Sequence, residues 1–142
     1  MLTEKQQAFK EHISGLSKNI APRYGIDWRL MAATAILQTG WGQSELAREA
    51  HNFFGIKATG STPENDVYIL RADRWDAPKR FRMYGSEVDS CHAYGRLMSK
   101  SSHYAPAREA ALLKFVEVMA PVYCPEPGYG EKVVRLIKSL DQ

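Results

Sequence analysis

One helix that is apolar on most of its faces constrains this chain more than any other feature. Asp27 is a suitable N-cap, and Gly40 stands where helices commonly end. A helix with so little polar surface must be covered by other elements, so we expect it at the centre of the fold. Gln38 then lies in its final turn. The residues that carry the apolar character are Leu30, Met31, Ala33, Thr34 and Leu37.

Capping signals predict two further helices in the first third of the chain. Thr3 and Gln6 form a capping-box pattern, after which apolar residues recur at helical spacing until Pro22. This pattern is typical of an amphipathic helix with one buried face. Ser44 is the expected N-cap of a short helix that runs through Ala50.

Three more helices are predicted in the last third. Ser86 caps the first, which ends at Ser101-Ser102. Pro106 starts the second and Pro121 stops it. Residues 123–129 form a stiff proline-braced loop, and residues 132–140 close the chain as an amphipathic helix.

A small β-hairpin lobe is predicted over about residues 62–85. Residues 67–70 and 81–84 are rich in strand-forming residues, and turn-forming residues precede the first run. The fold class is therefore α+β, mainly α. The chain has 142 residues and 44% hydrophobic content, enough for one ordinary core, so we expect a single domain over residues 1–142.

Charge and hydropathy limit the classes of partner that this chain is expected to bind. The formal net charge is +3, which does not indicate nucleic-acid binding but suits an anionic cell-wall polymer. No apolar run approaches the roughly 20 residues that a membrane span needs, so no membrane insertion is expected. The N-terminus lacks the apolar core of a secretory signal peptide. Predicted helices that begin near Met1 and finish near Gln142 favour a complete small protein.

No metal site or cofactor is predicted. Cys91 and Cys124 lack CxxC spacing, and we expect reduced structural thiols rather than one disulfide. No serine lies in a GxSxG motif, so the sequence does not predict the serine nucleophile that many hydrolases use. The histidines share no metal-ligand spacing; they are His12, His51, His92 and His103.

Four blocks in a fixed order resemble one family. Residues 35–42 read Ala-Ile-Leu-Gln-Thr-Gly-Trp-Gly, and residues 52–58 read Asn-Phe-Phe-Gly-Ile-Lys-Ala. Residues 81–86 read Phe-Arg-Met-Tyr-Gly-Ser, and residues 123–132 read Tyr-Cys-Pro-Glu-Pro-Gly-Tyr-Gly-Glu-Lys. Together they are similar to glycoside hydrolase family 73, the glucosaminidases that include flagellar rod-associated wall hydrolases. The resemblance implies a lysozyme-like fold with a β-hairpin lobe beside the cleft, and endo-β-N-acetylglucosaminidase activity on peptidoglycan glycan strands.

Gln38 stands where this family has its catalytic glutamate. Cleavage of a glycosidic bond needs a proton for the leaving oxygen. The last turn of a buried helix suits that acid, because desolvation and the helix dipole both raise a carboxyl pKa. Glutamine keeps the size of glutamate but has no proton to give at neutral pH. Two interpretations compete: a natural pseudo-enzyme, and an inactivated form of an enzyme with glutamate at this position. Since a pseudo-enzyme would be expected to drift around this position and the rest of the motif is intact, we favour the inactivated form.

The second carboxylate is expected in the β-lobe, where the family's Thr-x-Glu run has no match. Asp73 is the first candidate for the base or charge stabiliser, and Asp76 is the second and a candidate substrate contact. Glu64 and Asp66 follow them. A solvated ion pair with a neighbouring arginine is almost as good an interpretation of Asp73. The shorter aspartate leaves room for a water, which favours inversion if the carboxyl groups stand roughly 6.5–9.5 Å apart.

Aromatic residues are candidates for sugar contact, because flat rings cover the apolar faces of pyranoses. Tyr123 lies in the block that resembles the family's catalytic-tyrosine segment, so we assign it a catalytic role. Asn52 either binds the N-acetyl group or ties its own loop. Trp41 and Phe54 fit packing beneath the cleft better, although Trp41 stays a candidate contact. The other candidate contacts are Phe53, Tyr84 and Tyr129.

Two other functions stay open from the sequence. One is a muramidase or lytic transglycosylase on a related fold, and the other is a non-catalytic peptidoglycan-binding or assembly protein. The substrate lies in the periplasm or cell wall, yet no signal peptide is present. The expected settings are therefore phage lysis or a virion, a secretion-system effector, flagellar assembly, or a domain excised from an exported protein. We expect a monomer whose partner is the glycan strand.

Overall fold

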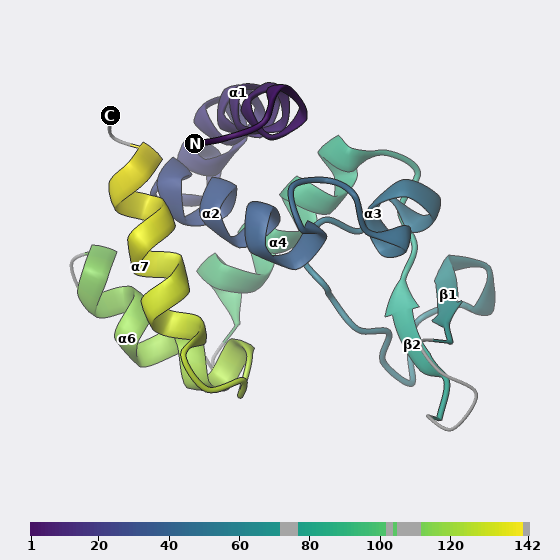
Figure 1. The fold of residues 1–142 in the computed structure, drawn as a ribbon. Helices are drawn as coiled ribbons and strands as arrows, with labels where there is room; N and C mark the ends of the chain where they lie inside the picture. The colour runs from purple at the N-terminus through teal and green to yellow at the C-terminus, as the bar shows by residue number, and fades with distance from the viewer. Residues whose placement is uncertain (72–76, 102–103, 105–111, 141–142) are drawn as a thin grey trace.

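The computed structural model describes residues 1–71, 77–101, 104 and 112–140. Helices form the body of the molecule, and a two-stranded antiparallel hairpin lies to one side of it (Figure 1). This architecture confirms the predicted mainly helical α+β class. The elements are α1 (Glu4–Ile20), η1 (Ala21–Tyr24), α2 (Trp28–Thr39), α3 (Glu45–Ala50), η2 (Glu64–Asp66), β1 (Val67–Leu70), β2 (Lys79–Arg82), α4 (Glu87–Lys100), α6 (Leu112–Tyr123) and α7 (Tyr129–Leu140).

The central position of α2 is confirmed. Every residue from Leu30 to Ile36 is buried, and α2 contacts α1, α4 and α7. The Asp27 side chain accepts a hydrogen bond from the backbone of Arg29, and Gly40 ends the helix in the left-handed conformation at φ 53°. Both ends of α2 are therefore set by local sequence, and its last turn is directed toward the site described below.

The other predicted N-caps are also confirmed. Thr3 and Gln6 form the reciprocal capping box of α1. Ser44 accepts from the backbone of Ala47 at the start of α3, and Ser86 accepts from that of Asp89 at the start of α4. Each cap needs only residues three positions apart, so these helix starts depend on local chemistry.

Two predicted boundaries near the C-terminus are wrong. Pro121 does not stop its helix, because α6 continues to Tyr123 with the proline in its last turn. Proline removes one N–H donor there, but the backbone of Cys124 still donates to Ala120. The final helix begins at Tyr129, three residues before the predicted Lys132. The start of the helix predicted at Pro106 lies outside the described residues.

The β-hairpin is confirmed, with a shifted second strand. Val67 pairs with Arg82 and Leu70 pairs with Lys79, so β2 covers residues 79–82 instead of the predicted 81–84. The chain leaves the sheet after Arg82 because the backbone of Tyr84 donates to Ala50. The segment 56–58 lies along the other side of β2, through backbone bonds from Arg82 to Ile56 and from Ala58 to Arg80.

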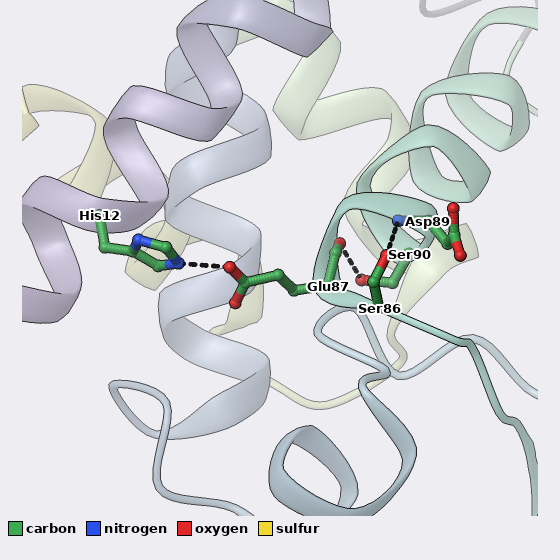
Figure 2. A network of polar contacts seen from close by, with 5 residues as sticks. All are labelled: His12, Ser86, Glu87, Asp89 and Ser90. Atoms are coloured by element: carbon green, nitrogen blue, oxygen red, sulfur yellow. Dashed lines mark hydrogen bonds and ion pairs between the residues drawn. The ribbon is translucent and has the colours of Figure 1, made fainter.

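Side-chain contacts join the helices behind the site. His12 on α1 and Glu87 on α4 form a partly exposed polar contact at 2.6 Å (Figure 2). Exposed pairs of this kind contribute roughly 0–1 kcal/mol, so packing matters more here. The ring of Tyr24 lies directly on Gly95, where an added Cβ would stand 2.3 Å from the ring. The Tyr24 hydroxyl is 2.6 Å from His92 Nδ1, which holds η1 against α4.

The two cysteines are free thiols, as expected. Cys91 is buried within the core, and this burial raises the pKa of its thiol to about 12. It is therefore a packing residue and not a reactive group. Among the described residues, no helix is long and apolar enough to span a membrane.

The contact between Gly95 and Tyr24 predicts a large stability difference between two glycine substitutions. Gly95→Ala forces the Tyr24 ring to move and should lower the free energy of unfolding by about 1–3 kcal/mol. Gly15→Ala is the matched control, because Gly15 is exposed in α1 with nothing within 4 Å of an added Cβ. That change should raise stability by about 0.5–1 kcal/mol. Urea unfolding followed by circular dichroism measures both, and equal effects would contradict the packing described.

Candidate active site

Gln38 lies in the last turn of α2 and is half-buried between two segments that are distant in sequence. Its side-chain nitrogen donates to the hydroxyl of Tyr129, at the start of α7, over 3.4 Å. Its side-chain oxygen faces Gly55, where an added Cβ would stand only 2.8 Å away. Gly55 also has φ 67°, which favours glycine. Glycine at position 55 therefore lets the loop approach the Gln38 carboxamide closely.

The amide of Asn52 holds the loop that carries Gly55. Its nitrogen donates to the carbonyls of Ile56 and Arg82, both at 2.9 Å. Its oxygen accepts from the backbones of Phe54 and Ile56, at 3.3 and 3.2 Å. The side chain makes four bonds within the protein, and the residue is 1% exposed. Of the two roles that the sequence left open for Asn52, the structure shows the loop-tying one.

Tyr123 and Tyr129 meet this loop from the other side. The Tyr123 hydroxyl donates to the carbonyl of Phe54, and the two tyrosine rings are 6.1 Å apart. Burial raises the pKa of Tyr129 to about 12, an effect that its bond with Gln38 partly opposes. Burial also raises the pKa of Tyr123 well above its usual value. Both phenols are thus protonated at neutral pH and act through their hydroxyl groups.

The other aromatic candidates mostly pack below the site. Phe54 is 1% exposed and stacks on Tyr94, with the ring centroids 4.4 Å apart. Phe53 is buried against Phe9. Trp41 is half-buried against the core and adopts φ 62°, which directs the chain out of α2. These positions agree with the packing role expected for Trp41 and Phe54, while sugar contact by Trp41 and Phe53 stays a prediction.

A groove of about 700 Å³ runs between α6, the proline-rich loop and the start of α7. Tyr129 lines this groove and also bonds Gln38, so it connects the groove to the end of α2. Gln38 itself does not line the groove. Tyr129 therefore contacts both the apolar groove and the last turn of α2.

The carboxylates predicted to complete the site are only partly described. Asp73 and Asp76 lie outside the described residues. Glu64 is exposed and forms an ion pair with Arg80, so it is occupied within the hairpin. Asp66 lines a separate hollow beside Tyr84. In the described parts of the chain, no group of three or more His, Cys, Asp and Glu side chains is arranged to hold a metal ion.

Two features of the site escaped the sequence analysis. The bond between Gln38 and Tyr129 joins residues 91 positions apart, and no spacing rule predicts it. The close approach of Gly55 to Gln38 was also missed. Its signal was a glycine inside the aromatic run of residues 53–56, because such a glycine often marks a close backbone approach.

A family model and several known proteins match this chain. A model of the glucosaminidase family, described as mannosyl-glycoprotein endo-beta-N-acetylglucosaminidase, matches residues 15–142. The chain is 27% identical to the peptidoglycan hydrolase FlgJ of Salmonella typhimurium, over 98% of this chain and 48% of FlgJ. It is 27% identical to the exo-glucosaminidase LytG of Bacillus subtilis, over 97% of this chain and 52% of LytG. The chain thus spans about half the length of these two relatives.

A solved structure shows the same fold. The peptidoglycan hydrolase from Sphingomonas sp. A1 superposes with a TM-score of 0.79 at 28% identity, covering 96% of this chain and 91% of that one. This likeness extends over the helical body and the hairpin together. The lysozyme-like fold expected from the four sequence blocks is confirmed.

The four hydrogen bonds of the Asn52 amide, called the Asn52 clamp below, predict that a nearly isosteric substitution strongly lowers stability. Asn52→Asp removes both donated bonds and leaves two carbonyls facing a carboxylate, which should cost about 2–4 kcal/mol of unfolding free energy. Asn65→Asp is the control, because Asn65 is exposed in η2 and should change stability by less than about 0.5 kcal/mol. Thermal unfolding at pH 7 compares the two variants. Similar melting temperatures would contradict the clamp.

Proposed function

We propose, because this chain belongs to the glucosaminidase family, that it binds the glycan strands of bacterial peptidoglycan at the end of α2, with Gln38 in the general-acid position. The proposed reaction of the corresponding glutamate enzyme is endo-β-N-acetylglucosaminidase cleavage. The chain with glutamine is proposed to bind the strand without cutting it. The support is the family match over residues 15–142.

The observation that carries this proposal is the setting of the Gln38 side chain. It ends a buried helix, is held from one side by Tyr129, and is approached by glycine backbone on the other. A carboxyl in this place would be partly desolvated at the negative end of the helix dipole, and both effects raise its pKa. That is the requirement for an acid that still holds its proton near neutral pH.

The neighbouring tyrosines fit supporting roles in such a reaction. Tyr129 is protonated, so its hydroxyl can donate to a carboxylate at position 38 after the proton has left. Tyr123 holds the carbonyl of Phe54, and with it the loop that faces the reacting group. Asp73, with Asp76 second, stays our proposal for the opposing carboxylate, which would position a water or stabilise the oxocarbenium ion.

The biological setting is also a proposal. The substrate places the action in the periplasm or cell wall. FlgJ and LytG, the relatives above, are named for wall hydrolysis and glucosaminidase activity, which supports the same polymer as the partner here. Flagellar assembly, a secretion system, phage lysis or a longer exported protein would each bring such a domain to the wall. We propose that it acts there as a monomer.

Restoring the acid should restore cleavage. Gln38→Glu is expected to release reducing ends from purified peptidoglycan at a rate about 10²–10⁴ times that of the unchanged chain, the usual contribution of a general acid. Mass spectrometry of the released fragments measures the outcome. New N-acetylglucosamine reducing ends support the glucosaminidase assignment, and new N-acetylmuramic acid ends would assign a muramidase instead.

Gln43→Glu is the matched control, because Gln43 is exposed just beyond the end of α2 and should stay inactive. If Gln38→Glu binds insoluble wall but releases no reducing ends, the hydrolase proposal fails. The non-catalytic wall-binding alternative then takes its place.

The contact with Tyr129 predicts a shift in pH dependence. In the Gln38→Glu enzyme, activity is lost as pH rises through the pKa of the acid, which must be protonated. The Tyr129 hydroxyl stabilises the ionised carboxylate and so lowers that pKa. Adding Tyr129→Phe removes this donor and so raises the pKa of the acid. The alkaline limb of the kcat–pH profile should therefore shift to higher pH by about 1 unit. Tyr68→Phe, whose hydroxyl bonds Glu45, is the control and should leave the limb in place.

A further inference from the structure

A second hollow, separate from the Gln38 site, lies between the segment after β2 and the outer face of α4. Its volume is about 450 Å³. Three of its side chains come from α4 at positions 89, 92 and 96, a spacing that places them on one helix face. The others come from η2 and from residues 82–85. The polar residues that line it are Asp66, Arg82, Tyr84, Asp89, His92 and Arg96.

The charged groups of this hollow do not neutralise one another. Within the part of the chain that the structure describes, Arg82, Arg96, Asp66 and Asp89 form no ion pair. Figure 2 shows the Asp89 carboxylate directed away from Glu87, which instead reaches the histidine of α1. In contrast, Glu64 of η2 and Arg80 of β2 do form an ion pair. Two cations and two anions are thus left available around one space.

Arg82 also has a buried donor without a partner. Its Nε atom is buried and makes no hydrogen bond. The guanidinium lies over the ring of Tyr84, 5.6 Å from the centroid, so its orientation is set by packing. This nitrogen is shielded from solvent, so what Arg82 offers to the hollow that it lines is the positive charge of its guanidinium.

The balance of charges selects the class of ligand. A simple anion would satisfy the arginines and leave the aspartates facing it, and a simple cation would do the reverse. A ligand with a carboxylate and an ammonium group a few bonds apart satisfies both. This is the chemistry of an amino acid with free polar ends. Tyr84 lines the same hollow, and its hydroxyl interacts with Arg82.

We propose that the hollow binds the zwitterionic amino-acid end of a wall peptide. The inference rests on the proposed function, because peptidoglycan strands carry short peptides that bear free carboxylate and ammonium groups. The two sites are joined through one side chain: the Asn52 amide bonds the carbonyl of Arg82 and also holds the loop that reaches Gln38. A glycan strand at Gln38 and its peptide at the hollow would thus be held by the same part of the fold.

The test uses the whole chain and a defined probe, the tripeptide N-acetyl-alanyl-γ-glutamyl-lysine, whose single ammonium group is on the lysine side chain, with binding followed by NMR shifts of backbone amides. The native chain should bind it, with shifts at residues 82–96. Arg96→Gln and Asp89→Asn should each weaken binding at least tenfold. Lys100→Gln, at the far end of α4 and outside the hollow, should leave binding unchanged. Circular dichroism melts confirm that each variant is folded.

Two modified probes separate a zwitterion site from a site for one charge. Acetylation of the lysine side chain removes the ammonium group, and amidation of the carboxyl groups removes the anions. Each modification should weaken binding at least tenfold. If either modified tripeptide binds as well as the free one, or if the Arg96 and Asp89 variants bind like the native chain, the inference is wrong.

The outcome is independent of the test of the catalytic proposal. Reducing-end release by Gln38→Glu from glycan strands stripped of peptide reports on the Gln38 site alone. Cleavage of these strands without tripeptide binding overturns the peptide site and leaves the proposed function standing. Tripeptide binding without any cleavage supports the hollow as a peptide site and contradicts the proposed hydrolase activity.

Discussion

The four hydrogen bonds of the Asn52 amide hold the arrangement on which the site depends. They join the loop after α3 to the end of β2 and close the loop on itself. Because the amide is buried, each lost bond would leave a backbone group unsatisfied away from water, so the loop has one favourable conformation. That conformation places the Phe54 carbonyl on Tyr123 and the Gly55 backbone on Gln38. The Asn52 side chain thus adds to the bond between Tyr84 and Ala50 in joining the hairpin to the rest of the fold.

Burial of α2 gives the site its electrostatic character. The helix is covered over its length by α1, α4 and α7, so its carbonyl end emerges into a partly desolvated space. The only hydrogen bond described for the Gln38 side chain there is the one to Tyr129. The tyrosines remain neutral because burial raises their pKa values, so they add hydrogen bonds without adding charge. The partial burial favours a protonated acid over an ionised one, and a hydrogen bond from Tyr129 would oppose this effect in part.

The parts of the fold that local chemistry determines could be predicted from the sequence. Asp27, Ser44 and Ser86 cap helices through residues two or three positions away, and Gly40 ends α2 because glycine tolerates positive φ. The boundaries that failed depend on distant partners. β2 ends at Arg82 because Tyr84 bonds Ala50, and the approach of Tyr129 to Gln38 spans 91 positions. The sequence named Gln38, Tyr123 and Tyr129 as candidate site residues, but it did not predict the hydrogen bonds that these side chains make.

The direction of one hydrogen bond distinguishes the glutamine site from a glutamate site. Here the Gln38 nitrogen donates to the Tyr129 oxygen, so the tyrosine proton is directed elsewhere. A carboxylate has no proton to donate and would instead accept that tyrosine proton, which reverses the polarity of the contact. Glutamine and glutamate have nearly the same shape, so the exchange mainly inverts this hydrogen bond, which we propose supports proton transfer in a glutamate form. We therefore propose that a chain with the clamp, the glycine and both tyrosines around such an amide holds a glycan strand without cutting it.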